Sequence, residues 1–527
     1  MAAEGRRVVG QGMSAGPMAG SLAALKGSSD SSATSSSDDG IGEESVSISA
    51  VSSYAPKRMK WCFIAVANFI ALLLCVSLLF DNPKKAYQSF FSEKNLHANT
   101  ITLIYLFGLL FVAVEDRTNI NKSAVMLVTS TMMWTVHATS GRNHNLEHEE
   151  TQEVQAVGTV VLFVLPAMAV VELIDHFHGF AILTRGITRL MGRHETRLLP
   201  LISVLTFFLC AVNDNLTSTL VALKIIRHVA VEDEQWRRAC AGMVVIAANA
   251  GGTWSPVFDV STVLEPTTGI LWQRNKVTAV GCIQWLFLPS LVSMLTPMIG
   301  IMWQSPPRRR GRSHPVPEAL TPTSRLVFAF GVLGTLFVPL LKFSLSLPAY
   351  IAMMLVLGFL WLVSESRLVV PPKNKHGFHT AVEAALHKVD LTGLLFFVGM
   401  LLAVGLMTHC GILRQIASWL IRVFGQSRVA MCSLLGLTSA LADSTSLIDE
   451  AMDVYTSHPL DHPVWQLAAL AGSTGSSLTS FGSLAGVALM STENVSFLWY
   501  LQWVTPWAAL GFFAGIATFQ AERLLIG

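Results

Sequence analysis

One apolar stretch of the chain carries polar groups where a membrane segment should have none. Residues 207–226 read FFLCAVNDNLTSTLVALKII, with Asn213, Asp214 and Asn215 near the centre. An ionisable group at the centre of a bilayer costs a few kcal/mol, so it is found mainly where it binds an ion or a substrate. The stretch therefore predicts a polar site within a membrane.

The composition agrees with a membrane protein. Of the 527 residues, 52% are hydrophobic and 13% are charged, and the mean hydropathy is +0.52. Soluble domains carry roughly 25% charged residues. The formal net charge of +2 is close to zero, so the charge balance does not indicate nucleic-acid binding. The seven cysteines lack the paired spacing of a zinc site or disulfide framework, so we interpret them as packing residues and expect no cofactor.

The pattern around Asp214 recurs in the second half of the chain, where Asp443 interrupts another apolar stretch. In each half a hydrophobic run and an amphipathic segment precede the acid, and a glycine-rich interruption follows it. The features are VVLFVLPAMAVVELI, FAILTRGITRLM, FFLCAVNDNLTSTL and AANAGGTWSPVFD, then TGLLFFVGMLLAVGL, ILRQIASWLIRVF, MCSLLGLTSALADSTSLIDEAM and LAGSTGSSLTSFGSLAG. The repetition predicts an internal duplication, and paired interrupted segments point to the binding site of a secondary transporter.

Segment lengths predict an all-α polytopic protein with about 11 transmembrane helices and two re-entrant hairpins in inverted repeats, because a spanning helix needs about 20 residues. Each arm flanking Asp214 or Asp443 has only about 10–15 residues, half of a crossing. We expect a disordered tail at 1–55 and scaffold helices at 56–140, followed by a first repeat at 154–303 with a hairpin near 199–226 and a broken helix at 241–271. A basic cytosolic loop at 304–325 and connecting helices and a loop at 326–388 should then lead to the second repeat. The second repeat is expected at 389–519, with a hairpin near 428–456 and a broken helix at 464–490.

The basic residues set the expected orientation, because Lys and Arg are in excess on the cytosolic side of membrane proteins. Lys57, Arg58 and Lys60 precede the first apolar run and predict a cytosolic amino terminus. The run RRRGR at 308–312 falls on the same side, and the acidic loop at 139–153 falls outside. Counted this way, the second repeat begins by crossing in the opposite direction to the first.

The candidate site combines carboxylates with carboxamides, hydroxyls and freed backbone carbonyls. Such oxygens suit a hard cation, and a buried carboxylate can instead hold a proton once the cation has left. Competition for one carboxylate is sufficient for antiport. The expected cation and proton ligands are Asn213, Asp214, Asn215, Thr217, Ser218, Asp259, Asp443, Ser444 and Thr445, with Na+ at Asp214 and at Asp443. The expected broken-helix ligands are Asn249, Gly251, Gly252, Thr253, Ser255, Ser473, Thr474, Gly475 and Ser476.

These segments resemble the NhaD-type sodium/proton antiporters of the ion transporter superfamily, which includes citrate transporter-like proteins. The matching stretches include VELIDHFHGF, VIAANAGGTWSPVFDVSTV, DLTGLLFFVGMLLAVGLMTHCGIL and WQLAALAGSTGSSLTSFGSLAGVALM, and the resemblance covers about residues 100–520. It implies exchange of Na+ or Li+ for H+ by alternating access, a scaffold domain that forms a homodimer and a mobile transport domain. The family usually has Asp-Asn in the second hairpin, where this chain has Asp443 and Ser444.

Three alternatives stay open at this point. A carrier of dicarboxylate, arsenite or sulfate belongs to the same superfamily, although a buried carboxylate at each tip would repel an anion. A non-transporting receptor on a transporter fold would explain the altered second tip. The third alternative is an intramembrane enzyme, but no nucleophile, metal-binding or phosphate-binding motif in the sequence supports it. Glu172 and Asp175, at the end of one span, are equally well explained as site groups and as interfacial groups that reach water.

Overall fold

The computed structural model describes thirteen stretches of the chain, all within one of its two compact units, Ala71–Gly527. They are residues 93–118, 120–139, 146–192, 194–230, 233–255, 267–304, 321–345, 347–366, 380–424, 427–441, 447–449, 451–452 and 458–526. Regular structure in these stretches is entirely helical, which confirms the predicted all-α class. The expected tail at 1–55 and the apolar run at 61–80 lie outside the described residues.

Five helices of the described part are long and apolar enough to cross a membrane. They contain Leu96–Ala113, Glu150–His176, Ala279–Gln304, Pro322–Lys342 and Leu391–His409. A sixth candidate combines Phe497–Trp503 with Thr505–Leu525, two helices that meet at a 53° bend. Ala349–Glu365 and Arg428–Ser439 are apolar but shorter. The chain is therefore a multi-pass helical membrane protein.

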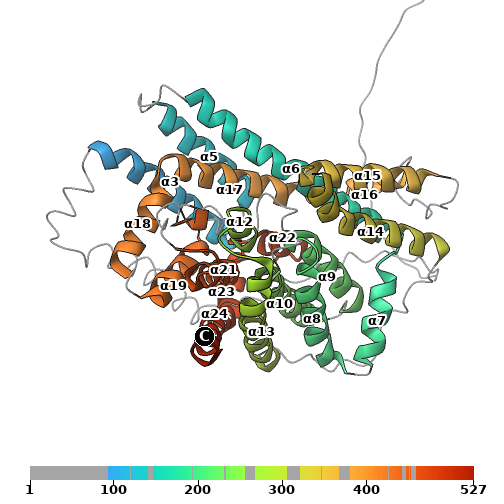
Figure 1. The fold of residues 1–527 in the computed structure, drawn as a ribbon. Helices are drawn as coiled ribbons and strands as arrows, with labels where there is room; N and C mark the ends of the chain where they lie inside the picture. Colours follow the sequence, from blue (N-terminus) through green and yellow to red (C-terminus); the bar gives the residue numbers. More distant parts are fainter. Residues whose placement is uncertain are drawn as a thin grey trace, which may run out of the picture. The chain divides into compact units, whose positions relative to one another are not determined.

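Three helices from distant parts of the sequence lie side by side in Figure 1: α3, α5 and α17. They span Glu93–Ala113, Lys122–Thr139 and Leu391–His409, and the short α4 covers Glu115–Thr118. Ser123 Oγ donates to Thr392 O at 2.7 Å, and Trp134 Nε1 donates to Leu402 O at 3.1 Å, so α5 and α17 run parallel. Leu146–His176 forms α6, which begins inside the stretch predicted as an acidic loop. It contacts α17 and the pair α14 and α15, Pro322–Leu345 and Ala349–Glu365.

Shorter helices fill the middle of the sequence. An amphipathic helix, α7, covers Ala181–Met191, and α8 and α9 follow at Leu198–Cys210 and Asn215–Val229. The remaining helices before α17 are η2 Glu195–Arg197, α10 Glu234–Thr253, α12 Thr267–Gln273, α13 Ala279–Gln304 and α16 Ala381–Leu386. Those after α17 are α18 Ile412–Phe424, α19 Arg428–Ser439, α21 Pro463–Gly475, η3 Ser476–Leu478, α22 Leu484–Thr492, α23 Phe497–Trp503 and α24 Thr505–Ile526.

Two helix pairs pack with their backbones in direct contact at glycines. A Cβ on Gly251 of α10 would overlap the carbonyl oxygen of Phe207 in α8. In the same way, a Cβ on Gly475 of α21 would overlap the carbonyl oxygen of Gly436 in α19. Small residues at such positions let helices approach closely, which is a main source of helix association in membranes. The pairs α8–α10 and α19–α21 are thus built in the same way.

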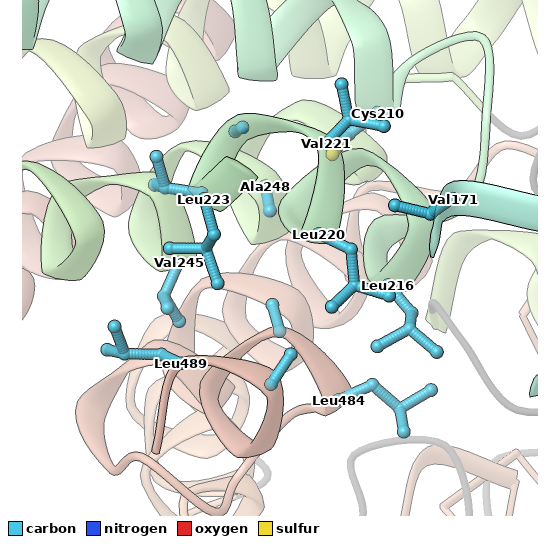
Figure 2. Close-up of a cluster of buried hydrophobic side chains, with 14 of the residues drawn as sticks. Val171, Cys210, Leu216, Leu220, Val221, Leu223, Val245, Ala248, Leu484 and Leu489 are labelled. Carbon is cyan, nitrogen blue, oxygen red and sulfur yellow. The ribbon is translucent and has the colours of Figure 1, made fainter. Parts of the chain in front are cut away.

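A buried apolar cluster joins α9 and α10 of the first half to α22 of the second half. Figure 2 shows Leu216 and Leu220 of α9 and Val245 of α10 facing Leu484 and Leu489 of α22. All five side chains are buried, and α22 contacts both α9 and α10. The long helices α13 and α24 also lie against each other (Figure 1). Helices from the two halves therefore share one packed interior.

The glycine contacts lead to a first prediction. Gly251→Ala and Gly475→Ala force α10 from α8 and α21 from α19, so each should lower stability by about 1–3 kcal/mol, the usual cost of overpacking. Gly186→Ala in α7 is the matched control, since nothing lies within 4 Å of its added Cβ and alanine favours a helix. Thermal unfolding in detergent measures the difference. Equal midpoints for Gly251→Ala and Gly186→Ala would contradict the close packing.

Candidate cation and proton site

Asp214 lies in the turn between α8 and α9, where it caps the amino terminus of α9. Its Oδ1 accepts a hydrogen bond from the Thr217 backbone N–H at 2.8 Å. Aspartate is a preferred capping residue because it satisfies a backbone donor that the helix leaves open. Only 4% of Asp214 is exposed. The residue that brings charge into the apolar stretch therefore also starts the helix that follows it.

The first turn of α9 presents further oxygens that are buried beside this carboxylate. Asn215 Oδ1, Thr217 Oγ1 and Ser218 Oγ are inaccessible and have no hydrogen-bond partner among the described residues. A buried polar atom left without a partner costs about 1–3 kcal/mol. Oxygen atoms from carboxylate, amide and hydroxyl groups are the usual ligands of hard cations. The first turn of α9 thus has the donor set of a cation site.

Helix α10 supplies the space next to this turn. A Cβ on Gly252 would lie 2.7 Å from Asn215 Oδ1, so only glycine leaves room for the Asn215 side chain in this position. Gly251, one residue earlier, makes the contact with Phe207 of α8. The structure therefore brings the predicted residues Asn215, Gly251 and Gly252 together at the tip of the α8–α9 pair.

Asn249 connects α10 to the segment between α21 and α22. Its Nδ2 donates to Ser477 Oγ at 2.9 Å and to Ser483 Oγ at 3.0 Å. Ser477 belongs to η3 after α21, and Ser483 caps α22. All three side chains are buried. Sequence analysis named Asn249 but not its two serine partners, because no pattern indicated which serines of the glycine-rich segment face the other half.

The other broken-helix residues mostly bond to their own backbone. Thr253 Oγ1 donates to Asn249 O at 2.8 Å, Thr474 Oγ1 to Leu470 O at 2.5 Å, and Ser476 Oγ to Ser473 O at 2.7 Å. Ser255 is buried, and Asn213 is half-buried in the turn before Asp214. Asp259, Asp443, Ser444 and Thr445 lie outside the described residues, so the second tip stays a prediction.

An ion cluster that the sequence did not indicate lies at the carboxyl end of α9. Glu493, 1% exposed at its side chain, accepts from Arg227 Nε at 2.7 Å and from Arg237 Nε at 2.8 Å. These arginines lie in the last turn of α9 and the first turn of α10, and Glu493 follows α22. Single charges at the ends of apolar segments look like groups that reach water, so no signal in the sequence indicated this three-way contact.

A second ion pair joins α6 to α9. Lys224 Nζ lies 2.7 Å from Glu172 Oε1 and 3.3 Å from Asp175 Oδ2. The three side chains are 11–13% exposed. Glu172 and Asp175, for which the sequence left two interpretations open, are partners of Lys224 in this structure. Lys224 lies about 15 Å along α9 from Asp214, at about 1.5 Å per residue.

Comparison with known proteins places this arrangement in a class of membrane transporters. The citrate transporter family matches residues 109–370. Sodium/proton antiporter 1 of Arabidopsis thaliana is 34% identical over 81% of this chain and 73% of its own length. Sodium/proton antiporter 2 of the same plant is 33% identical over 80% of this chain and 99% of its own length. The Na(+)/H(+) antiporter NhaD of Alkalimonas amylolytica is 26% identical over 85% of this chain and 96% of its own length.

The chain is therefore a secondary transporter rather than an enzyme. It belongs to the NhaD-type sodium/proton antiporter family, as its resemblance in the hairpin and broken-helix motifs predicted.

The Glu493 cluster supports a prediction about stability. Glu493→Gln leaves Arg227 and Arg237 side by side without a counter-charge, and breaking a buried pair typically costs about 3–5 kcal/mol. Arg227 is 42% exposed, so we expect the lower end of that range. Glu234→Gln is the control, because Glu234 pairs with Arg238 on the surface of α10 and is 59% exposed. Exposed pairs contribute about 0–1 kcal/mol.

Thermal unfolding in detergent compares the two variants under one set of conditions. A clear drop in the Glu493→Gln midpoint with little change in Glu234→Gln is the expected result. If the two midpoints fall equally, Glu493 does not hold α9, α10 and α22 together.

Proposed function

We propose that this chain exchanges Na+, or Li+, for H+ across its membrane by secondary active antiport with alternating access. One observation carries the proposal: a buried carboxylate at a helix terminus, beside three buried side-chain oxygens that have no hydrogen-bond partner among the described residues. Its relatives over about four-fifths of the chain are sodium/proton antiporters by name. The transported ions are substrates, and the bilayer is the chain's other partner.

In this proposal Asp214 is the group that cation and proton share. Asn213, Asn215, Thr217 and Ser218 supply neutral oxygens around it, and Gly252 leaves the space that they need. A bound Na+ would satisfy the buried oxygens of α9 and balance the carboxylate charge. When the cation leaves, a proton can neutralise the same carboxylate before the empty site crosses an apolar barrier. A single carboxylate thereby couples the two fluxes in opposite directions.

The remaining proposed ligands come from the broken helices and the second tip. Asp443, Ser444 and Thr445 would form a second cation site, and Asp259 would serve as a further proton carrier. Asn249, Gly251, Thr253 and Ser255 on one side, and Ser473, Thr474, Gly475 and Ser476 on the other, would contribute carbonyl and hydroxyl oxygens. Carbonyls freed by a break in a helix are natural cation ligands.

We further propose that residues 154–303 and 389–519 are inverted repeats, each with a re-entrant hairpin, in a homodimeric protein of about 11 spans. The two glycine contacts support this duplication. Phe207 and Gly436, whose carbonyls touch the glycines of α10 and α21, precede Asp214 and Asp443 by the same number of residues. The equivalent contact point in both halves is what two copies of one packing unit would share.

The citrate transporter match keeps an anion substrate as a second candidate. The charge of Asp214 argues against it, because a carboxylate at the site repels an anionic substrate. Proteoliposomes with an inside-acid pH gradient decide between the two. Addition of external Na+ or Li+ should dissipate the gradient, whereas K+, citrate and sulfate should not. A change in internal pH on addition of citrate without Na+ would favour the anion carrier, and no flux with any substrate would favour a receptor.

The role of Asp214 leads to a mutational prediction. Asp214→Asn should abolish Na+-driven proton movement and keep the fold, because asparagine caps a helix about as well as aspartate but cannot exchange a proton. Asp214→Ala should abolish transport and also lose about 1 kcal/mol of stability with the cap. Proteoliposome flux and thermal unfolding separate the two effects. Wild-type flux in Asp214→Asn would remove Asp214 from the mechanism.

Direct competition also predicts a pH profile. Below the pKa of the shared carboxyl, each unit of falling pH should weaken apparent Na+ affinity roughly tenfold, because protons occupy the binding carboxylate. Above that pKa the affinity should become independent of pH. The half-saturating Na+ concentration, measured from about pH 6 to pH 9 in proteoliposomes, checks this. A flat profile over the whole range would rule out a shared carboxylate that titrates between about pH 6 and pH 9.

A further inference from the structure

A cluster of nitrogen and sulfur ligands lies where α3, α5 and α17 meet at one end. His97 is in the first turns of α3, His137 in the last turn of α5, and Cys410 is the cap that follows α17. Because α5 and α17 run parallel and α3 returns against α5, these three positions come together. None of them belongs to α8, α9 or α10, which hold the candidate Na+ site.

The ligand atoms are close enough to share one ion. His97 Nε2 lies 3.0 Å from His137 Nδ1, and Cys410 Sγ lies 3.5 Å from the same nitrogen. All three atoms fall within 4.8 Å of one another. Tetrahedral zinc, with Zn–N of about 2.0–2.1 Å and Zn–S of about 2.3 Å, places two nitrogens about 3.3 Å apart and a nitrogen and sulfur about 3.6 Å apart. Both short distances are near these values.

The histidine rings are oriented so that their nitrogens face each other. The ring centroids are 5.2 Å apart and the ring planes differ by 18°. Since the nitrogen atoms are only 3.0 Å apart, they lie between the two rings instead of at their outer edges. In this structure the two nitrogens share a hydrogen bond, and a bound metal ion would take the place of its proton. His137 is buried, whereas His97 and Cys410 are partly exposed, which leaves a route for an ion from solvent.

We propose that His97, His137 and Cys410 form a binding site for Zn2+ or a similar borderline transition-metal cation. Two imidazoles and a thiolate favour such ions over Na+ and Mg2+, which prefer oxygen ligands. Three protein ligands leave a fourth position for water. Bound zinc would link α3 and α5, at the start of the described chain, to α17 in its second half. The site would act independently of the transported cation.

Metal binding to the purified full chain tests this site. Protein stripped with a chelator is titrated with Zn2+ against a chromophoric chelator, and separately with Co2+ while the absorbance is recorded. We expect one Zn2+ per chain and, with Co2+, a charge-transfer band that requires a thiolate ligand. His137→Ala and Cys410→Ser should each weaken Zn2+ binding at least tenfold, and Cys410→Ser should abolish the Co2+ band.

Further variants separate loss of a ligand from loss of the fold. Cys410→His keeps three ligands, so it should retain Zn2+ but lack the thiolate band. Cys282→Ser removes a buried thiol outside the cluster and should behave as wild type in both assays. Absence of stoichiometric Zn2+ binding would overturn the proposal. Unchanged binding in both His137→Ala and Cys410→Ser would overturn it too, by placing the ion elsewhere, for instance at the stacked pair His458 and His462.

Discussion

The close contact between α8 and α10 determines what the candidate site can be. Gly251 lets the two backbones touch, and Gly252 then faces the Asn215 side chain. A larger residue at Gly251 would push the tip of the α8–α9 pair away from α10, and one at Gly252 would displace the Asn215 side chain. The turn at Asp214 would then open, and water could satisfy the oxygens of Asn215, Thr217 and Ser218. Backbone packing between two helices is therefore the reason that these polar atoms stay buried without partners in the part of the chain that the structure describes.

The hydroxyl groups near the two glycine contacts differ in their bonding. In the second half, Ser439 Oγ donates to Gly472 O at 3.0 Å and Thr479 Oγ1 donates to Ala440 O at 2.5 Å, so hydroxyls there hold α19 against α21. In the first half, the hydroxyls of Thr217 and Ser218 lack such partners in the described structure. Hydroxyls that already bond to backbone have less capacity left for an ion. Among the described residues, Thr217 and Ser218 therefore keep open hydroxyls beside Asp214, and Ser480 keeps one in the second half.

The sequence was sufficient for the features that depend on local chemistry. An acid within an apolar run predicts a buried polar site, and Asp214 is buried and caps a helix. Contacts between distant segments could not be predicted from the sequence. The partners of Asn249, the arginines around Glu493 and the meeting of His97, His137 and Cys410 all depend on how helices pack in three dimensions. In the sequence Cys410 has no paired cysteine, so it resembled a packing residue, because its histidine neighbours are hundreds of residues away.

The Glu493 cluster fixes the end of α9 opposite to Asp214 against α10 and α22. α9 carries Asp214 at its amino end and Arg227 in its last turn, and Glu493 connects that turn to α10 and α22. The buried cluster of Leu216, Leu220, Leu484 and Leu489 holds the same helices between these ends (Figure 2). A helix fixed at both ends and along its length moves as a rigid body with its neighbours. Any alternating-access motion that carries Asp214 would therefore also carry α10 and α22, so the sliding surface must lie outside this group.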